Sequence, residues 1–255
     1  MQNSAYAPNS SITTKIMRRV TPMRRRRLLS FNIDRPVVSF TFDDCPQSAI
    51  THGLRPLESE GWRGSVYIAA RLFGITNHHG LHMTGEDTKA VFENGHEIGD
   101  HGYSHIDGNQ TPLRQFKNDI EINQTILADL GLPPCKTFAY PFGEVTPQLK
   151  HSLKTRFTGM RGIQPKPMVG YVDLNQIAST PVYAGTDFDT AIKQIKALKE
   201  TPAWLTLFTH DIQDTPSNWG CTPAQMIAII KAVKEIGAIV LPVCEAIDYL
   251  KARTI

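Results

Sequence analysis

Two adjacent aspartates and a later pair of histidines are the residues of this sequence most suited to chemistry. Asp43 and Asp44 close the apolar run 37–42, and His101, which begins a His-x-x-x-His motif ending at His105, follows Asp44 by 57 residues. Two imidazoles and one carboxylate form a facial ligand set for one divalent metal and leave positions open for water. Open positions are typical of a catalytic metal. Because the second carboxylate could accept a proton from such a water, the pattern indicates a metal-assisted hydrolase.

The surrounding segments explain how these residues would meet. The short run 37–42 is β-branched and aromatic, which predicts a buried strand that ends at the aspartates. Residues 97–99, after the helix stop at Gly95, predict a second strand that leads to the histidines. We expect His101 and His105 to share one face of a helical turn, so that both rings point at one ion. Barrels of alternating strands and helices carry their chemistry at the C-terminal ends of the strands.

Each of these pieces also has an ordinary explanation. An Asp-Asp pair alone is most often a solvated turn or a helix cap, and two histidines at this spacing are often a coincidence of surface or core. The combination is much rarer, and both pieces follow strand-like segments. It therefore favours a site.

In these motifs the sequence resembles the polysaccharide deacetylases with a NodB-homology domain, also called carbohydrate esterase family 4. Residues 41–46 resemble the family's TFDDGP motif, with Cys45 at the position of the glycine. Residues 97–105 resemble its second motif, with Gly102 at a position that is usually serine or threonine. The likeness extends over residues 36–250.

The resemblance implies a role for each candidate site residue. It makes Asp43 the catalytic base. The metal ligands that it implies are Asp44, His101 and His105. The apolar run that ends in Thr-His-Asp resembles the last family motif, which makes His210 the general acid. A lone histidine after a buried strand is usually structural, but the other motifs favour the catalytic role here.

The third motif departs from the family. Its usual Arg-x-Pro-(Tyr/Phe) aligns here with Ala-Tyr-Pro-Phe, so Ala139 replaces the arginine that orients the catalytic aspartate. A subset of the family carries this form. Some other cation, or the backbone, must then hold Asp43. By analogy Tyr140, Pro141 and Phe142 line the substrate groove, and the Tyr140 main-chain N–H is a candidate oxyanion donor.

The fourth motif of the family is an Asp-Trp pair that tunes the final histidine. Its best match is Asp187-Phe188, and Asp187 lies 23 residues before His210. Asp187 is therefore a candidate for tuning His210. The alternative is a helix N-cap, because Asp187 or Asp189 precedes the amphipathic run 191–200.

Length and patterning favour one α/β domain. A chain of 255 residues with 41% apolar residues suits a single core. Helix-like runs alternate with short apolar runs, and this alternation requires parallel strand pairing. The resemblance narrows the fold to a single-domain distorted (β/α)7 barrel of the NodB-homology type, over residues 31–255. The expected helices are 48–61, 85–94, 112–130, 191–200, 223–236 and 244–253, and the expected strands include 66–69, 136–139, 157–159, 203–208 and 239–241.

Positive charge is concentrated in residues 1–30. They contain seven Lys or Arg and no acid, whereas the whole chain has a net charge of +3, so the remainder is net acidic. We expect a basic, partly disordered N-terminal arm, with the disorder in residues 1–14. Such an arm could contact a membrane surface or an acidic glycan, although a solvated run or a surface strand or helix is more usual. No nucleic-acid partner is expected.

The remaining sequence features carry less chemistry. No apolar stretch approaches the length of a membrane span, and the run 28–31 is too short for a signal-peptide core, so we expect a cytoplasmic protein. Four cysteines without Cys-x-x-Cys spacing favour reduced thiols, and Cys45 is expected to line the pocket rather than react. The three histidines of residues 77–82 could suggest a second metal, but a polar loop is the preferred interpretation.

The combined interpretation is a metal-dependent hydrolase that removes acetyl groups from a carbohydrate. An N-acetyl sugar is the preferred substrate, and an O-acetyl ester would use the same groups. Zinc fits two histidines and a carboxylate best, and cobalt, nickel, manganese or iron also suit them. Should Asp43 not be the base, Glu144 is the next candidate. The alternatives are an amidase acting on a non-sugar C–N bond and a non-catalytic carbohydrate-binding protein on the same fold.

Overall fold

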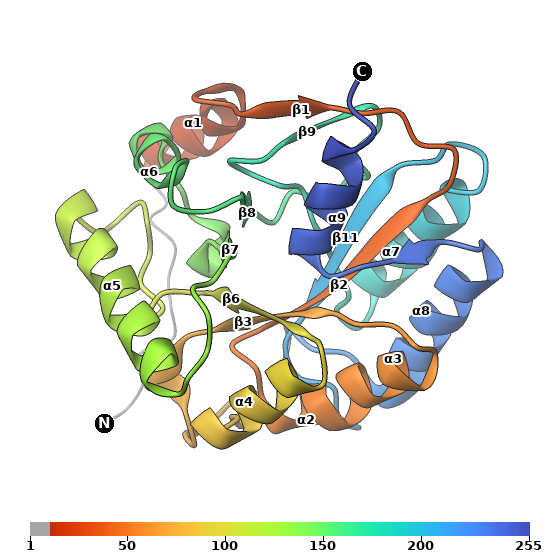
Figure 1. Ribbon diagram of the computed structural model, residues 1–255, viewed down its shortest axis with the longest axis horizontal. Coiled ribbons are helices and arrows are strands. Elements are labelled where there is room, and N and C mark those ends of the chain that lie inside the picture. The colour runs from red at the N-terminus through yellow and green to blue at the C-terminus, as the bar shows by residue number, and fades with distance from the viewer. Residues whose placement is uncertain (1–10) are drawn as a thin grey trace.

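The computed structural model describes residues 11–255 and is built around one curled sheet (Figure 1). The strands run parallel in the order β10-β11-β2-β3-β6-β7-β8, and β12 also pairs with β2. The sheet consists of β2 (Val37–Asp43), β3 (Ser65–Ile68), β6 (Glu97–Asp100), β7 (Thr137–Ala139), β8 (Gly159–Arg161), β10 (Thr180–Pro181), β11 (Trp204–Thr209) and β12 (Ile239–Val240).

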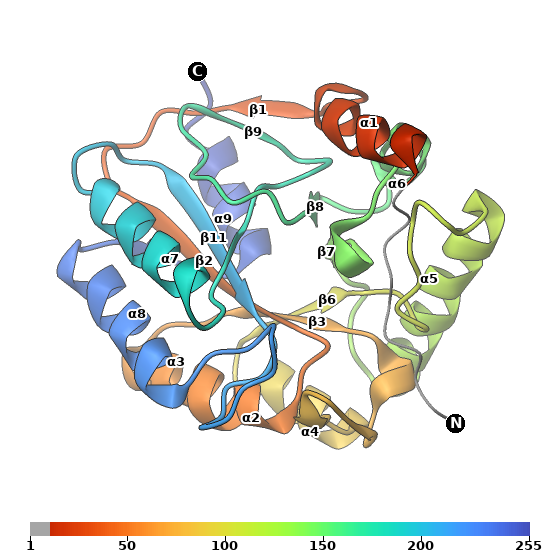
Figure 2. The ribbon, with the colours of Figure 1, turned by 180° about the vertical axis from the view of Figure 1, so that it is seen from behind.

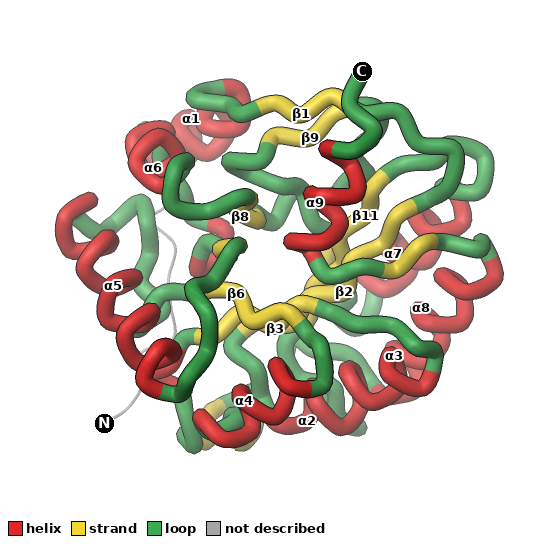
Figure 3. The backbone as a smooth tube through the Cα atoms, in the orientation of Figure 1, coloured by secondary structure: helices red, strands yellow, loops and turns green. Residues whose placement is uncertain are grey.

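A short stretch of chain joins the two edges of this sheet. Beside β8, the Ile177 N–H donates to the Met160 carbonyl at 2.7 Å, and Ile177 forms an isolated parallel bridge with Arg161. Three residues later the chain enters β10, which pairs with β11. Figure 3 shows the strands following one another around a ring. The expected distorted barrel of alternating strands and helices is thus confirmed.

Helices cover the outside of the sheet (Figures 1 and 2). Those expected at 85–94, 112–130, 223–236 and 244–253 are confirmed to within two residues, whereas the helix expected at 191–200 begins earlier and the one at 48–61 forms in three pieces. The helices are α1 (Ile12–Val20), α2 (Gln47–Ala49), a π-helical turn (Ile50–Leu54), α3 (Arg55–Ser59), α4 (Gly85–Glu93), α5 (Leu113–Asp129), α6 (Pro147–Leu153), α7 (Thr186–Ala197), α8 (Pro223–Glu235) and α9 (Val243–Lys251).

The central strand and the helix starts follow from local chemistry. All seven residues of β2 are buried, because β11 and β3 flank it and both of its faces are covered. That explains a continuous apolar run in place of an alternating one. Helices α4 and α8 begin at capping boxes, in which the side chains of Thr84 and Thr222 accept from the N–H groups of Asp87 and Gln225.

The basic N-terminal segment packs on the barrel. Its strand β1 (Leu28–Ser30) pairs antiparallel with β9 (Tyr171–Asp173). Residues 12–14 were expected to be disordered but lie in α1, whereas residues 1–10 fall outside the described part of the chain. No helix within residues 11–255 is long and apolar enough to cross a bilayer.

Arg27 shows that the arm's charge has a packing role. Its half-buried guanidinium donates to the carbonyls of Phe157, Thr158 and Leu174 at 3.0, 2.8 and 3.4 Å. Burial lowers the pKa of Arg27, although Asp173 nearby acts in the opposite direction. The guanidinium therefore ties the arm to the chain that enters β8.

Replacing Arg27 should destabilise the fold. Arg27→Ala leaves several carbonyls without their donor, and we expect the free energy of unfolding to fall by about 2 kcal/mol, the scale of hydrogen bonds to a charged group. Urea denaturation measures this change. The exposed neighbour Arg24 is the matched control, because Arg24→Ala should unfold at the wild-type urea concentration. Equal midpoints for both variants would show that the arm is not part of the packing.

Candidate metal centre

The chain turns sharply where β2 delivers the two aspartates. Asp44 and Cys45 have φ angles of +57° and +55°, in the left-handed region that residues other than glycine seldom adopt. The Cys45 side chain was expected to line the pocket but lies in the core, with its thiol 3.3 Å from the Phe42 carbonyl and 3.7 Å from that of Tyr67. Burial raises the pKa of the Cys45 thiol well above its usual value. It therefore stays protonated and does not act as a nucleophile.

The two histidines reach the site from a loop, and the helical turn expected for them is wrong. His101 follows β6 directly, and Gly102 and His105 have φ angles of +72° and +52°. These left-handed residues bend the loop so that the two imidazole rings lie with centroids 4.7 Å apart. A Cβ atom on Gly102 would lie 2.8 Å from Asp119 Oδ2. This close approach explains why glycine replaces the usual serine or threonine.

The Asp44 carboxylate faces both imidazoles. Asp44 Oδ1 lies 3.7 Å from His101 Nε2 and 3.6 Å from His105 Nε2. His101 Nδ1 is 2.8 Å from the Ala139 carbonyl, which can only accept, so Nδ1 holds the hydrogen and Nε2 carries the lone pair. Burial lowers the pKa of His105 to about 4. Burial alone would raise the pKa of Asp44, but the nearby His105 and His101 more than offset it and the pKa lies below its usual range.

This donor set fits a divalent metal. Within the described residues, Asp44 Oδ1 is buried and has no hydrogen-bond partner. Tetrahedral ligand atoms at about 2.0–2.1 Å from zinc are separated by about 3.4 Å. The distances of 3.6 and 3.7 Å from Asp44 Oδ1 to the two Nε2 atoms are close to that value. Asp44, His101 and His105 are therefore brought together as candidate ligands.

An arginine that the sequence did not single out holds Asp43. The Arg161 guanidinium forms a buried ion pair with Asp43 Oδ2. Burial alone would raise the pKa of Asp43, but Arg161 and, to a smaller extent, His101 and His210 lower it, so the carboxylate is ionised. Its second oxygen, Oδ1, is buried and has no hydrogen-bond partner in the described part of the chain.

In the family motif the arginine stands at the position of Ala139. Arg161 lies beside that position, on the neighbouring strand. Ala139 on β7 and Arg161 on β8 are partners in the strand register, so their side chains leave the sheet on the same face. The Arg161 side chain is 1% exposed and lies between two aromatic rings, 5.2 Å from the ring centroid of Tyr67 and 4.8 Å from that of Phe208. These rings hold the guanidinium in position for Asp43.

The third-motif residues are arranged differently from the expectation. The Tyr140 N–H already donates to the Arg161 carbonyl at 3.0 Å, because the β7–β8 pairing continues past the strand end, so the oxyanion role expected for it is wrong. The Tyr140 side chain is buried and its hydroxyl donates to the Asn175 carbonyl at 3.1 Å. Tyr140 and Pro141 are thus both buried. Phe142 does reach the site, with its ring centroid 4.3 Å from that of His105.

His210 lies at the site, and Asp187 lies within α7 rather than at its N-cap. His210 follows β11, and its Nδ1 is 3.1 Å from the Trp219 carbonyl. Burial lowers the pKa of His210 to about 4, and the strongest opposing influences are Asp43 and Asp44. Asp187 lies in the first turn of α7, whose N-cap is Gly185. The N-cap role is therefore wrong for Asp187, whereas the tuning of His210 stays a prediction.

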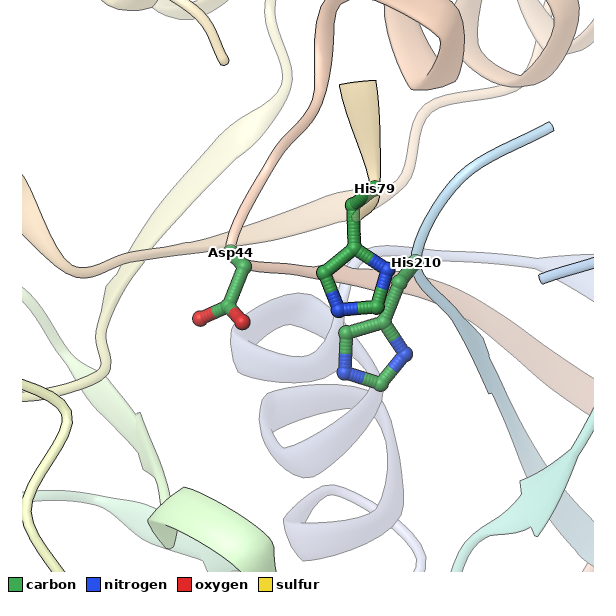
Figure 4. A group of neighbouring side chains, drawn as sticks. All are labelled: Asp44, His79 and His210. Atoms are coloured by element: carbon green, nitrogen blue, oxygen red, sulfur yellow. The ribbon is translucent and has the colours of Figure 1, made fainter. Parts of the chain in front are cut away.

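His79 is a site residue that sequence reasoning missed. It lies at the turn between β4 (Thr76–Asn77) and β5 (Gly80–Leu81), where a polar loop was expected, yet it is only 4% exposed. Its ring stacks on that of His210 beside Asp44 (Figure 4). The sequence feature that could have identified His79 is the cluster of three histidines in residues 77–82. For Arg161 the signal was a cation at the end of a short apolar run.

Comparison with known families identifies the class of this protein. The family model described as polysaccharide deacetylase matches residues 32–161, and the chain belongs to that family. No protein of curated function gives a significant match.

Solved structures of carbohydrate esterase family 4 share the fold. A peptidoglycan N-acetylglucosamine deacetylase is 19% identical with a TM-score of 0.59, and the match covers 94% of this chain and 96% of that one. An acetyl xylan esterase from Clostridium thermocellum, in complex with a cobalt ion, is 19% identical with a TM-score of 0.58. The match covers 84% of this chain and 91% of that one. A mutant of a Bacillus anthracis pseudoenzyme, with restored enzymatic activity, is 13% identical with a TM-score of 0.63 and coverages of 85% and 69%.

Removing any one of the three candidate ligands should abolish tight metal binding. Asp44→Ala, His101→Ala and His105→Ala each leave two protein ligands, which do not hold an ion as three do. Elemental analysis of the purified proteins after dialysis measures the loss. Cys244→Ala, far along the chain on α9, is the control and should keep its metal. Full occupancy in the three ligand variants would refute the assignment.

Removing the arginine should make stability depend on pH in a defined way. Arg161→Met leaves the Asp43 charge buried and unpaired, which should lower the free energy of unfolding at neutral pH by about 3–5 kcal/mol. The pKa of Asp43 should rise in this variant, because Arg161 is the main group that lowers it. The difference from wild type should therefore shrink as the pH falls and Asp43 becomes protonated.

Urea denaturation across pH measures this dependence. The control is Arg156→Met, which removes a surface ion pair with Glu121 and should change stability little at any pH. A deficit in Arg161→Met that stays constant from neutral to acidic pH would contradict the pairing with Asp43.

Proposed function

We propose that this protein is a metal-dependent hydrolase that removes acetyl groups from a carbohydrate, with N-acetyl sugars preferred over O-acetyl esters. The observation that carries the proposal is the pairing of two differently held carboxylates. Arg161 stabilises the ionised form of Asp43, whose other oxygen is buried and has no hydrogen-bond partner within residues 11–255, while Asp44 faces two imidazole nitrogens. One carboxylate is thus suited to take a proton and the other to hold a cation.

The metal position is assigned to Asp44, His101 and His105. A divalent ion held there would polarise the acetyl carbonyl and lower the pKa of water. Zinc is favoured by two imidazoles and one carboxylate, and cobalt, nickel, manganese or iron also suit this set. The acetyl xylan esterase that shares this fold is in complex with a cobalt ion.

Asp43 is assigned the role of base. Its low pKa keeps it ionised, and its fixed Oδ1 can accept a proton from the attacking water. Glu144, the alternative base, pairs with Arg18 at 2.6 Å and with Asn109, so its carboxylate is already engaged. That engagement supports Asp43 over Glu144.

His210 is assigned the role of general acid. Its ring is fixed by the Trp219 carbonyl through Nδ1, which leaves Nε2 to pass a proton to the leaving amine or alcohol. With a pKa of about 4 the imidazole rests neutral at pH 7 and must gain a proton during the cycle. The carboxylates of Asp43 and Asp44 favour that gain.

The substrate class is inferred from the family and the surface beside His210. Trp219 is 46% exposed and its indole lies beside the rings of His78 and His79, with centroids 5.3 and 5.9 Å away, so it offers an apolar face for a sugar ring. Phe142 lies against His105, with ring centroids 4.3 Å apart. Peptidoglycan N-acetylglucosamine deacetylase and acetyl xylan esterase on the same fold support an acetylated glycan.

Acetate release from acetylated glycans, measured with defined added metals, tests this function. Release from an N-acetyl glycan, dependent on added metal, is the expected result. Activity on non-sugar amides alone would favour the amidase alternative. Glycan binding without acetate release would favour a non-catalytic protein, a state with a precedent in the pseudoenzyme that shares this fold.

If Asp43 is the base, its replacement should stop turnover without affecting metal binding. Asp43→Asn keeps the shape of the side chain but removes the proton acceptor, so we expect full metal occupancy and acetate release reduced by about 10² or more. Elemental analysis and acetate assays of one preparation measure both. Glu144→Gln is the matched control and should lose far less activity. Near wild-type turnover in Asp43→Asn would place the base elsewhere.

The acid assignment predicts a dependence on the leaving group. His210→Ala should reduce hydrolysis of an N-acetyl amide far more than that of an activated acetyl ester, whose phenolate leaves without a proton. Asp187→Asn tests the tuning role separately: a shifted basic limb of the pH profile would support it, and an unchanged profile would refute it. Equal losses on amide and ester in His210→Ala would assign His210 a structural role.

A further inference from the structure

Two histidines outside the first ligand set lie together beside Asp44. The rings of His79 and His210 stack with centroids 4.8 Å apart and planes 9° from parallel. Figure 4 shows both rings next to the Asp44 carboxylate. One nitrogen of each ring and one Asp44 oxygen all lie within 4.8 Å of one another. Ligands about 2.1 Å from one ion lie at most about 4.2 Å apart, so small side-chain movements bring these three atoms to a single ion.

The outer nitrogen of each ring is already engaged. His79 Nδ1 lies 2.9 Å from Asp211 Oδ1, and His210 Nδ1 lies 3.1 Å from the Trp219 carbonyl. Carboxylates and carbonyls only accept, so each Nδ1 holds the ring hydrogen and donates it. Each Nε2 therefore carries a lone pair, and these are the nitrogens left to face Asp44.

Asp211 fixes the orientation of His79. This carboxylate is fully buried and also accepts from the Ser217 N–H at 2.7 Å and from Gln213 Nε2 at 2.9 Å. A carboxylate on the outer nitrogen of an imidazole is the usual partner of a metal-binding histidine. His101 has a comparable partner, because its outer nitrogen donates to the Ala139 carbonyl.

We propose that Asp44, His79 and His210 form a second divalent-metal position beside the first, with the Asp44 carboxylate shared between them. Two lone pairs and a carboxylate charge converge there, and a cation satisfies all three. The second ion binds more weakly than the first, because the shared carboxylate is already partly neutralised and the two cations repel each other.

Occupation of the second position inhibits hydrolysis. This consequence depends on the proposed function, in which His210 Nε2 passes a proton to the leaving group. A nitrogen that binds a metal cannot carry that proton. Activity should therefore rise with the first equivalent of metal and fall as the second is bound.

Titration of the metal-free full-length chain with Co²⁺, followed by equilibrium dialysis and absorption, tests the proposal. We expect two ions per wild-type chain and one in His79→Ala. Asp211→Asn should lower the affinity for the second ion by about 10- to 100-fold. The exposed neighbour His78 is the matched control, and His78→Ala should still bind two. Thermal unfolding of each variant verifies the fold.

Two results would overturn the second position. One is saturation of the wild-type chain at a single ion, and the other is two ions retained by His79→Ala. The first ligand set is tested separately, because His101→Ala should lose the tighter ion and keep the weaker one. Failure of that variant to lose the tighter ion counts against the proposed function, whereas the His79 variant decides the second position.

Discussion

The buried ion pair between Asp43 and Arg161 is the interaction on which the rest of the site depends. A buried carboxylate without a partner would become protonated, and a protonated Asp43 could not act as a base. The pair forms only when β8 lies beside β7 and the sheet curls far enough to bring residue 161 to the end of β2. The stretch 177–181 holds that curl by contacting β8 and β11. The barrel topology thus sets the charge state of Asp43, the carboxylate proposed as the base.

Backbone strain is concentrated at the same place. Asp44, Cys45, His105 and Phe142 all have positive φ angles, a state that costs of order 1–3 kcal/mol for residues other than glycine. Their surroundings compensate for it, since the Cys45 thiol contacts two carbonyls and the Phe142 ring packs on His105. These turns aim the carboxylate and the imidazoles inward, where regular strands or helices would direct them along the sheet or outward.

Local patterns predicted the parts of the fold and site that depend on neighbours in sequence. The run 37–42, the Asp-Asp pair and the paired histidines are each short signals, and the family resemblance united them. Arg161 and His79 could not be assigned in this way, because each meets its partner only in the folded chain, far from it in sequence. The oxyanion role predicted for Tyr140 is wrong for a related reason. Its N–H donates to the Arg161 carbonyl because of the β7–β8 register, which the sequence does not specify. The N-cap alternative for Asp187 failed because α7 begins earlier than the amphipathic run indicates, with Gly185 as its N-cap.

The most direct test of the account is to move the arginine back to the family position. Ala139 and Arg161 are register partners on adjacent strands, so an arginine at 139 should reach Asp43 from the same face. We expect Arg161→Ala to lose acetate release from an N-acetyl glycan, and the double variant Ala139→Arg/Arg161→Ala to recover a large part of it. A fully active Arg161→Ala would contradict the account, as would a double variant that folds and binds metal but is no more active than the single one.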